Sequence, residues 1–311
     1  MKLIQKINSY HINRNFVKFK KEKPDGTTYI YHNDDCEKII VTIIIPTLDK
    51  NREGYLPKLI EQIKKQTYKN WELILVCGDT RQGRAINCGV SVAKGKYIII
   101  LDDDTQITQN TLVEKMVHYM NKYKNIGMAG VSNLIPPNAN ILVKSVMLQI
   151  PRRTSSLVKK ITDSDLAEHP CCIIPREVFI NIGGENELIP RGLDPYLRNE
   201  IRKAGYRVVV LPGLYIHHLP PKRFSTLVKQ LYRNGKMAAY VNKFYSQFVV
   251  DLSFKHDEKV VEKRSFPYRV ARFGVRLLLA VLNFQLYYLL SMVLYSLGFT
   301  IGYLTLKEND L

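Results

Sequence analysis

Short apolar runs alternate with amphipathic segments through the first 125 residues of the chain. The run at 39–45 is almost entirely β-branched or aliphatic, which is typical of a strand buried on both faces of a parallel sheet. The expected strands are 39–45, 73–76 and 97–101, and the expected helices are 55–67, 84–94 and 111–123. This β-α-β-α-β order predicts an α/β domain with a mostly parallel sheet flanked by helices.

The pattern continues more sparsely in the second half. A strand at 171–174 and a Gly183–Gly184 turn precede a helix at 195–204, a strand at 207–211 and a helix at 224–240. We therefore place one domain at 39–250.

The C-terminal end of the chain is apolar. No charged residue occurs from Leu277 to Leu306, a stretch longer than the roughly 20 residues that cross a bilayer. The sequence predicts a transmembrane or membrane-associated helix at 277–306, and a buried or interfacial helical hairpin is the alternative. The basic segment 251–276 before it contains Arg264, Arg269, Arg272 and Arg276, which places that flank and the main domain on the cytoplasmic side of the membrane.

Residues 1–38 form a basic N-terminal arm. The sequence is consistent with two interpretations of this arm. In the first, the arm lies on an anionic membrane surface. In the second, it forms a short hairpin on the main domain, with Pro24–Asp25–Gly26 as its turn.

Three polar segments follow the expected strands, and the carboxyl ends of strands in open α/β sheets meet in one crevice. These segments are Pro46–Thr47, Cys77–Gly78–Asp79 and Asp102–Asp104. Three consecutive carboxylates repel one another, and a divalent cation that prefers oxygen ligands removes the conflict. Alone, the three aspartates are equally consistent with a solvated loop or a helix cap.

The aspartates stand within a longer resemblance to family 2 glycosyltransferases of the GT-A fold. The family's opening strand is similar to Val41-Thr-Ile-Ile-Ile-Pro-Thr47. Its DxD segment is similar to Ala93-Lys-Gly95-Lys-Tyr97-Ile-Ile-Ile-Leu-Asp-Asp-Asp104, and its Gln/Arg-rich helix is similar to Phe224-Ser-Thr-Leu-Val-Lys-Gln230-Leu-Tyr-Arg233. Ile174–Glu187 resembles the stretch before the catalytic acid, and Leu193–Asp194 occupies the place of the ED motif. The likeness covers residues 40–240.

The resemblance implies roles for particular residues. Asp194 is the general base, Asp104 is the principal metal ligand for Mn²⁺ or Mg²⁺, and Asp102 and either His217 or His218 complete the metal side. The residues implied in nucleotide-sugar binding are Pro46, Thr47, Asp79, Arg81, Arg84, Asp102, Asp103, Gln230 and Arg233. Each histidine is also consistent with ordinary strand-end hydrogen bonds, and Gln230 and Arg233 with a solvated helix face.

Three departures from the family pattern affect the residues more than the class. Cys77 stands where the family often has Asp, and Leu193 stands where its ED motif has Glu. The segment between Val76 and Ala85 is also short, so we expect a more open nucleotide pocket.

The resemblance implies an inverting transferase that moves a sugar from a nucleotide-sugar to a hydroxyl of a lipid-linked or cell-surface glycan. A polyprenyl-phosphate sugar synthase and a catalytically silent glycan-binding scaffold are the alternatives. The formal charge of +18 suits an anionic membrane or phosphorylated substrates, and no nucleic-acid-binding motif accompanies it. The partners expected are a nucleotide-sugar donor, a glycan or polyprenyl-linked acceptor and membrane lipid, at the cytoplasmic face of the cell membrane.

Overall fold

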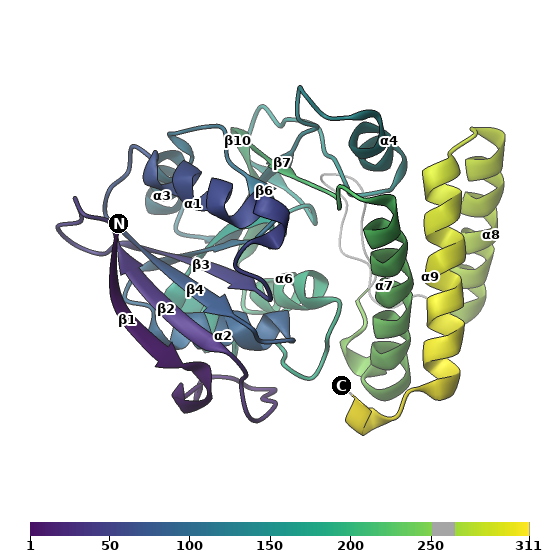
Figure 1. Cartoon of the computed structure of the whole chain (residues 1–311), viewed down its shortest axis with the longest axis horizontal. Coiled ribbons are helices and arrows are strands. Elements are labelled where there is room, and N and C mark those ends of the chain that lie inside the picture. The colour runs from purple at the N-terminus through teal and green to yellow at the C-terminus, as the bar shows by residue number, and fades with distance from the viewer. Residues whose placement is uncertain (251–264, 311) are drawn as a thin grey trace.

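A computed structural model describes residues 1–250 and 265–310, which fold around one twisted sheet with helices on both faces (Figure 1). The strand order is β1-β2-β4-β3-β5-β9-β7-β10-β6, with β8 paired to β10. The strands are β1 (Lys2–Asn8), β2 (Thr27–His32), β3 (Val41–Thr47), β4 (Trp71–Cys77), β5 (Tyr97–Leu101), β6 (Thr105–Gln106), β7 (Ile126–Asn133), β8 (Thr162–Asp163), β9 (Cys171–Pro175) and β10 (Arg207–His218). The helices are α1 (Tyr55–Lys64), α2 (Gln82–Val92), α3 (Leu112–Lys122), α4 (Ile141–Gln149), α5 (Arg176–Asn181), α6 (Leu193–Lys203), α7 (Phe224–Phe244), α8 (Phe266–Leu282) and α9 (Leu286–Thr305).

The expected α/β class is confirmed, and the sheet is mixed. Strand β3 pairs in parallel with β4 and β5, as a β-α-β-α-β order requires. Strand β9 runs antiparallel between β5 and β7. Strand β7 and helices α4 and α5 lie in segments for which the sequence pattern predicted no element.

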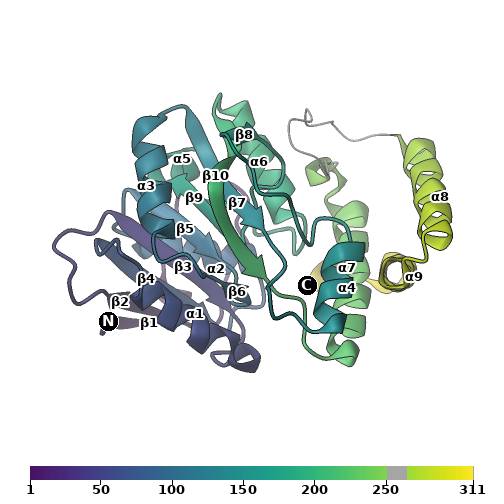
Figure 2. The ribbon, with the colours of Figure 1, turned by 90° about the horizontal axis from the view of Figure 1, so that it is seen from above.

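The strands at the centre of the sheet are buried on both faces, as their continuous apolar runs predict. Side chains of β3 alternate between two hydrophobic clusters, with Ile43 on one face and Ile44 on the other. Helices α1 and α3 cover the first face, and α2, α5 and α6 cover the second (Figure 2). This packing holds the carboxyl ends of β3 and β5 in fixed positions.

The basic N-terminal segment adds two strands to the edge of the sheet. Strand β1 pairs antiparallel with β2, and β2 pairs antiparallel with β4. The chain from residue 9 to residue 26 joins them, so Pro24–Asp25–Gly26 ends a long connection instead of forming a tight turn. At Gly26 the backbone has φ +81°, and a Cβ there would lie 2.0 Å from the carbonyl oxygen of Cys77. Glycine therefore permits both the left-handed conformation and the close approach.

Helices α7, α8 and α9 stand together at the end of the molecule opposite β1 (Figure 1). The apolar stretch at 277–306 is a hairpin, because α8 ends at Leu282 and α9 begins at Leu286. Residues 251–264 of the expected basic linker lie outside the described residues, and the linker's last part, from Phe266, is already helical. Among residues 1–250 and 265–310, only α9 is long and apolar enough to cross a membrane.

Candidate active site

The three aspartates lie where β3, β5 and β10 end. Thr47, the last residue of β3, donates its hydroxyl hydrogen to Asp103 Oδ2 at 2.6 Å. Asp102 and Asp103 directly follow β5, and their neighbour Asp104 precedes the short strand β6. The convergence of Thr47 with the aspartates agrees with the rule that strand ends of an open sheet share one crevice.

Each carboxylate has different partners. Asp102 Oδ1 accepts a hydrogen bond from Gln82 Nε2 at 2.7 Å, at the start of α2. Arg52 donates to Asp103 Oδ1 at 2.9 Å from Nε and to Asp104 Oδ2 at 3.1 Å from Nη2. Arg52 was missed by sequence reasoning, because it lies in a short turn after β3 with no distinctive spacing.

The end of β10 brings His218 to the aspartates. Its backbone pairs with Thr105 of β6, and its amide donates to Asn133 Oδ1 at 2.8 Å. These contacts place His218 Nε2 at 3.0 Å from Asp104 Oδ1 and at 3.8 Å from Asp102 Oδ2. His217 Nδ1 instead lies 2.7 Å from the carbonyl oxygen of Leu134, so of the two candidate histidines only His218 faces the carboxylates.

The pKa values of the two carboxylates move in opposite directions. Burial, reinforced by the charge of Asp104, raises the pKa of Asp102 to about 7. Burial acts in the same sense on Asp104, but His218 and Arg52 outweigh it and lower the pKa of Asp104 to about 2. The two neighbouring carboxyl groups therefore differ in how readily they ionise, and a divalent cation would relieve the repulsion between them.

The ligand atoms of Asp102, Asp104 and His218 all lie within 4.8 Å of one another. These are the three residues predicted on the metal side. Two carboxylate oxygens and one imidazole nitrogen suit a divalent ion such as Mn²⁺, whereas Mg²⁺ prefers oxygen ligands alone. The donor set therefore fits a divalent metal.

Asp194 lies in the first turn of α6, where it contacts a buried histidine. Its Oδ1 accepts a hydrogen bond from the backbone amide of His169 at 2.7 Å, and His169 Nδ1 lies 3.5 Å away. On the other side of the ring, His169 Nε2 lies 2.9 Å from Glu185 Oε1. Sequence reasoning identified neither His169 nor Glu185, whose partners are distant in the chain.

The His169 contacts change the charge of the site. Burial disfavours the imidazolium, but Asp194 and Glu185 outweigh it and raise the pKa of His169 to about 10. Burial likewise opposes ionisation of Asp194, yet the positive His169 keeps the pKa of Asp194 below its usual value. Asp194 is therefore an ionised carboxylate whose side chain is 30% exposed, held by a histidine that is 2% exposed.

Leu193, which stands at the place of the family's glutamate, has a packing role. It is buried in a cluster with Tyr196, Tyr240 and Val241, which joins α6 to α7.

Asp79, Arg81 and Arg84 are buried and bonded to the protein. Arg84 donates to Asp79 from Nε at 2.8 Å and from Nη2 at 3.0 Å, and it donates from Nη1 to the carbonyl oxygen of Glu22 at 2.9 Å. Arg81 donates from Nη1 to the carbonyl oxygen of Glu187 at 2.7 Å. These contacts connect the N-terminal segment and the 183–187 loop to α2, and a role in donor binding remains a prediction for all three residues.

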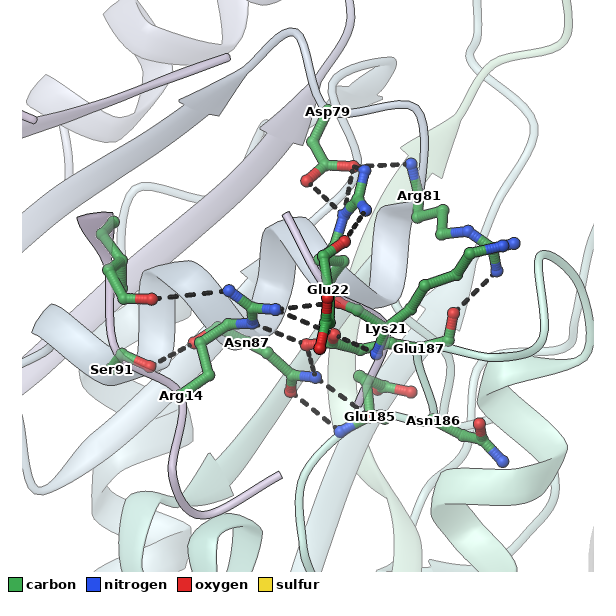
Figure 3. A network of polar contacts seen from close by, with 12 residues as sticks. Arg14, Lys21, Glu22, Asp79, Arg81, Asn87, Ser91, Glu185, Asn186 and Glu187 are labelled. Carbon is green, nitrogen blue, oxygen red and sulfur yellow. Dashed lines mark hydrogen bonds and ion pairs between the residues drawn. The ribbon is translucent and has the colours of Figure 1, made fainter. Parts of the chain in front are cut away.

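A second buried group of polar side chains lies beside them (Figure 3). Arg14 donates to Glu187 from Nε at 2.8 Å and from Nη2 at 3.1 Å. The same carboxylate accepts from the Lys21 amide at 2.8 Å and from Asn87 Nδ2 at 3.0 Å. The N-terminal connection is thereby fixed against the loop that carries Glu185.

The remaining predicted residues lie in β3 and α7. Pro46 is buried in β3 beside Val76 of β4. Gln230 on α7 accepts a hydrogen bond from Arg153 Nη2 at 3.2 Å, and Arg233 is exposed one turn further along α7.

Comparison with known proteins gives the site a family context. Residues 77–183 match the model of Glycosyl transferase family 2. A Streptococcus pneumoniae serotype 4 protein, glycosyltransferase GlyG, is 31% identical over 100 residues, which cover 24% of this chain and 33% of that protein. The match thus spans about a third of the relative's length.

One solved structure is similar in fold to this chain, and a second matches about two thirds of it. The mannosyltransferase PcManGT from Pyrobaculum calidifontis, in complex with GDP-Man and Mn²⁺, has a TM-score of 0.53 at 14% identity, over 88% of this chain and 89% of that one. S. aureus TarS 1–349 in complex with UDP-GlcNAc has a TM-score of 0.45 at 13% identity, over 66% and 67% of the two chains. The family model and the curated relative each match a part of this chain, and PcManGT is similar to it in fold.

Proposed function

We propose that this chain is an inverting, metal-dependent transferase that moves a sugar from a nucleotide-sugar to a hydroxyl of a lipid-linked or cell-surface glycan. The observation that carries the proposal is the grouping of Asp102, Asp104 and His218 within 4.8 Å, at the carboxyl edge of the sheet. Asp194 contacts His169, and the charges of both residues act on the pKa of Asp102. In this proposal the metal ion and the ionised base act together in one reaction.

Asp102, Asp104 and His218 would hold the ion, which supplies charge neutralisation for the nucleoside-diphosphate leaving group. Thr47 orients Asp103 on the donor side, and Gln82 orients Asp102. Arg52 keeps the carboxylates compensated, since its guanidinium contacts both Asp103 and Asp104. The proposal also includes roles in binding the nucleotide-sugar donor for Pro46, Thr47, Asp79, Arg81, Arg84, Asp103, Gln230 and Arg233.

Asp194 would take the proton from the acceptor hydroxyl as the oxygen attacks the anomeric carbon on the face opposite the diphosphate. Its depressed pKa keeps it ionised near neutral pH. His169 acts as a positioning residue, because its amide donates to Asp194 while Glu185 holds the other end of the ring. A single displacement with an ionised base gives inversion.

We propose further that the α8–α9 hairpin attaches the enzyme to the cytoplasmic membrane surface without crossing the bilayer. Helix α9 is long and apolar enough to cross a membrane, and less than a quarter of it is buried in the protein. The apolar side chains that α8 and α9 expose include Val270, Leu278, Val281, Val293, Leu297 and Leu304.

The packing of α9 on α7 supports an in-plane position. A Cβ on Gly298 would lie 2.1 Å from the Tyr232 carbonyl oxygen, so the two helices touch along their backbones. Helix α7 carries Lys229, Arg233, Lys236 and Lys243. A perpendicular α9 would take these charges to membrane depth, at about 2.5–3.5 kcal/mol for each residue near the bilayer centre.

The test is thermal unfolding of the detergent-solubilised protein with a panel of nucleoside diphosphates, with and without Mn²⁺. A nucleotide at 100 times its Kd stabilises the protein by about 2.7 kcal/mol. We expect one nucleotide to raise Tm only with metal, and the effect to disappear in Asp104→Ala.

Asp49→Ala is the matched control, because it removes an exposed carboxylate that lies two residues after β3 and outside the metal cluster. If no nucleotide raises Tm with any divalent metal, the donor site is not functional and the silent scaffold replaces the transferase.

A further inference from the structure

Arg153 lies in the connection between α4 and β8, and the end of β7 holds this connection in place. Thr154 Oγ1 donates to the carbonyl oxygen of Asn133 at 2.8 Å, and the Ser155 amide donates to the same oxygen at 2.8 Å. Asn133 Nδ2 in turn donates to the carbonyl oxygen of Arg153 at 2.7 Å. The backbone at 153–155 is therefore fixed to the last residue of β7.

The same Asn133 side chain connects Arg153 to the metal cluster. Its Oδ1 accepts a hydrogen bond from the backbone amide of His218 at 2.8 Å, while its Nδ2 donates to Arg153. One amide group thus stands between the backbone of Arg153 and that of the histidine proposed to bind the metal ion. Arg153 and His218 are neighbours in the fold, although 65 positions separate them in the sequence.

The charge of Arg153 acts on the carboxylates of the cluster. Burial raises the pKa of Asp104, and Arg153 is one of the positive groups that lower it. Burial lowers the pKa of the half-buried Arg153, and the charge of Asp104 opposes that shift. Glu168, whose charge also acts on Arg153, forms an ion pair with Arg152. Arg153 therefore adds positive charge beside the proposed metal ion.

Gln230 on α7 orients the guanidinium group. Its Oε1 accepts a hydrogen bond from Arg153 Nη2 at 3.2 Å. This neutral oxygen uses one of the five N–H groups of the guanidinium and leaves its charge uncompensated. The remaining N–H groups form the planar fork with which arginine binds phosphate oxygens.

The second arginine at the cluster has a different role. Arg52 donates to Asp103 and to Asp104, so it compensates the carboxylates themselves. In the proposed transfer, the bond between the anomeric carbon and the phosphate oxygen breaks, and its electron pair stays on that oxygen. The acceptor oxygen forms the new bond, and its proton passes to Asp194. The phosphate therefore gains negative charge, which a positioned cation stabilises.

We propose that Arg153 binds the phosphate that carries the sugar, and that Gln230 positions Arg153 for this contact. The inference rests on the proposed function and adds to it the residue that stabilises the leaving group. Gln230 then acts in donor binding through Arg153. Asn133 fixes the spacing between this arginine and the metal cluster.

The experiment compares nucleoside diphosphates with their monophosphates, because only the diphosphate has the second phosphate. Binding to the full chain in neutral detergent micelles with Mn²⁺ is measured by isothermal titration calorimetry. The probes are UDP, GDP, ADP, CDP and thymidine diphosphate, each with its monophosphate. We expect Arg153→Gln to weaken binding of the preferred diphosphate on the order of tenfold or more, because charge-assisted hydrogen bonds are lost, and to leave monophosphate binding unchanged.

Two further variants test how Arg153 acts. Arg153→Lys should recover part of the loss, since it restores the charge without the fork. Gln230→Ala should weaken the same diphosphate by a smaller factor and leave the monophosphate unchanged.

Binding of Mn²⁺ alone separates a phosphate contact from a structural role. Arg153→Gln removes a positive charge near the carboxylates, so Mn²⁺ should bind at least as tightly as in the wild type. Arg207→Gln is the charge-matched control, because Arg207 pairs with Asp163 at the end of β10 opposite His218. It should change neither Mn²⁺ nor nucleotide binding.

The inference and the proposed function fail differently. If the wild type binds a diphosphate with Mn²⁺ and Arg153→Gln keeps the same preference over the monophosphate, Arg153 does not bind the second phosphate. Weaker binding of Mn²⁺, diphosphate and monophosphate together in Arg153→Gln assigns the residue to the fold and also overturns the inference. A wild type that binds none of the diphosphates in the presence of Mn²⁺ overturns the proposed function, and the inference with it.

Discussion

The contact between α7 and α9 predicts that Gly298→Ala destabilises the protein, although alanine normally favours a helix. A Cβ at residue 298 would lie 2.1 Å from the Tyr232 carbonyl oxygen, whereas ordinary contact begins at 3.4 Å. The helices must therefore separate by about 1.3 Å, and the obstacle is backbone that cannot rotate away. Gly235, on the facing helix, would meet the carbonyl oxygen of Tyr295 at 2.0 Å in the same way.

The expected magnitude follows from two opposing effects. Overpacking against a rigid neighbour costs about 1–3 kcal/mol. Replacing glycine by alanine inside a helix returns about 1 kcal/mol. The difference is about 0–2 kcal/mol, and because separation also loses contacts along the interface, we expect a net loss of about 1–2 kcal/mol, which lowers Tm by about 2 °C or more for each kcal/mol.

Gly274→Ala is the internal control. Gly274 lies in α8, and a Cβ added to it would have no other atom within 4 Å, so its replacement by alanine should stabilise the protein by about 0.5–1 kcal/mol. Thermal and urea unfolding of the three proteins in one detergent give the comparison. A Gly298→Ala variant as stable as Gly274→Ala would refute the close helix contact and, with it, the in-plane position of α9.

Other predictions concern the buried charges. Glu187→Ala should lower the free energy of unfolding in urea by about 3–5 kcal/mol, because it leaves the Arg14 guanidinium buried without its carboxylate partner. Adding Arg14→Met should recover part of that loss. A Glu187→Ala variant as stable as the wild type contradicts this prediction. The folded pKa of His169 lies near 10, above its ordinary value of 6.5, so its stabilisation is complete below pH 6.5 and is lost as the pH rises through 10. His169→Gln should flatten the decline of unfolding free energy between pH 7 and pH 10, and an unchanged slope argues against the charged ring. Asp194→Asn should abolish sugar transfer to a hydroxyl while keeping metal-dependent nucleotide stabilisation; residual transfer would favour a phosphate acceptor, which needs little help from a base.

Much of the fold could be predicted because local pattern and burial agree. β5 begins and ends at the predicted residues, since its apolar run is bounded by Gly95 and the aspartates. Strand β7 was missed because Gly127, Ala129 and Gly130 break the apolar run. The reason is tertiary: a Cβ on Gly130 would lie 2.5 Å from the Cα of Ala167, and no local pattern reveals that neighbour.

The candidate site divides in the same way. The grouping of Asp102, Asp104 and His218 follows motif and topology, because each residue ends or follows a strand. His169, Glu185 and Arg52 were not foreseen, since each acts through a partner brought near only by folding. Asp79 was predicted to bind the donor because it lies in the loop after β4. The sequence did not predict that Arg84 would donate to both of its carboxylate oxygens.

The distance in sequence between Arg14 and Glu187 has a consequence for how the protein is made. The two residues are 173 positions apart. At the usual 5–20 residues per second, Arg14 is added to the chain roughly 9–35 s before Glu187. During that interval β1 and β2 can join β4, but the segment that carries Arg14 has no counter-charge to hold it. The segment that carries Arg14 therefore reaches its final place only after the loop that carries Glu187 has been made, and a chaperone that shields this segment in the nascent chain should raise the yield of folded protein.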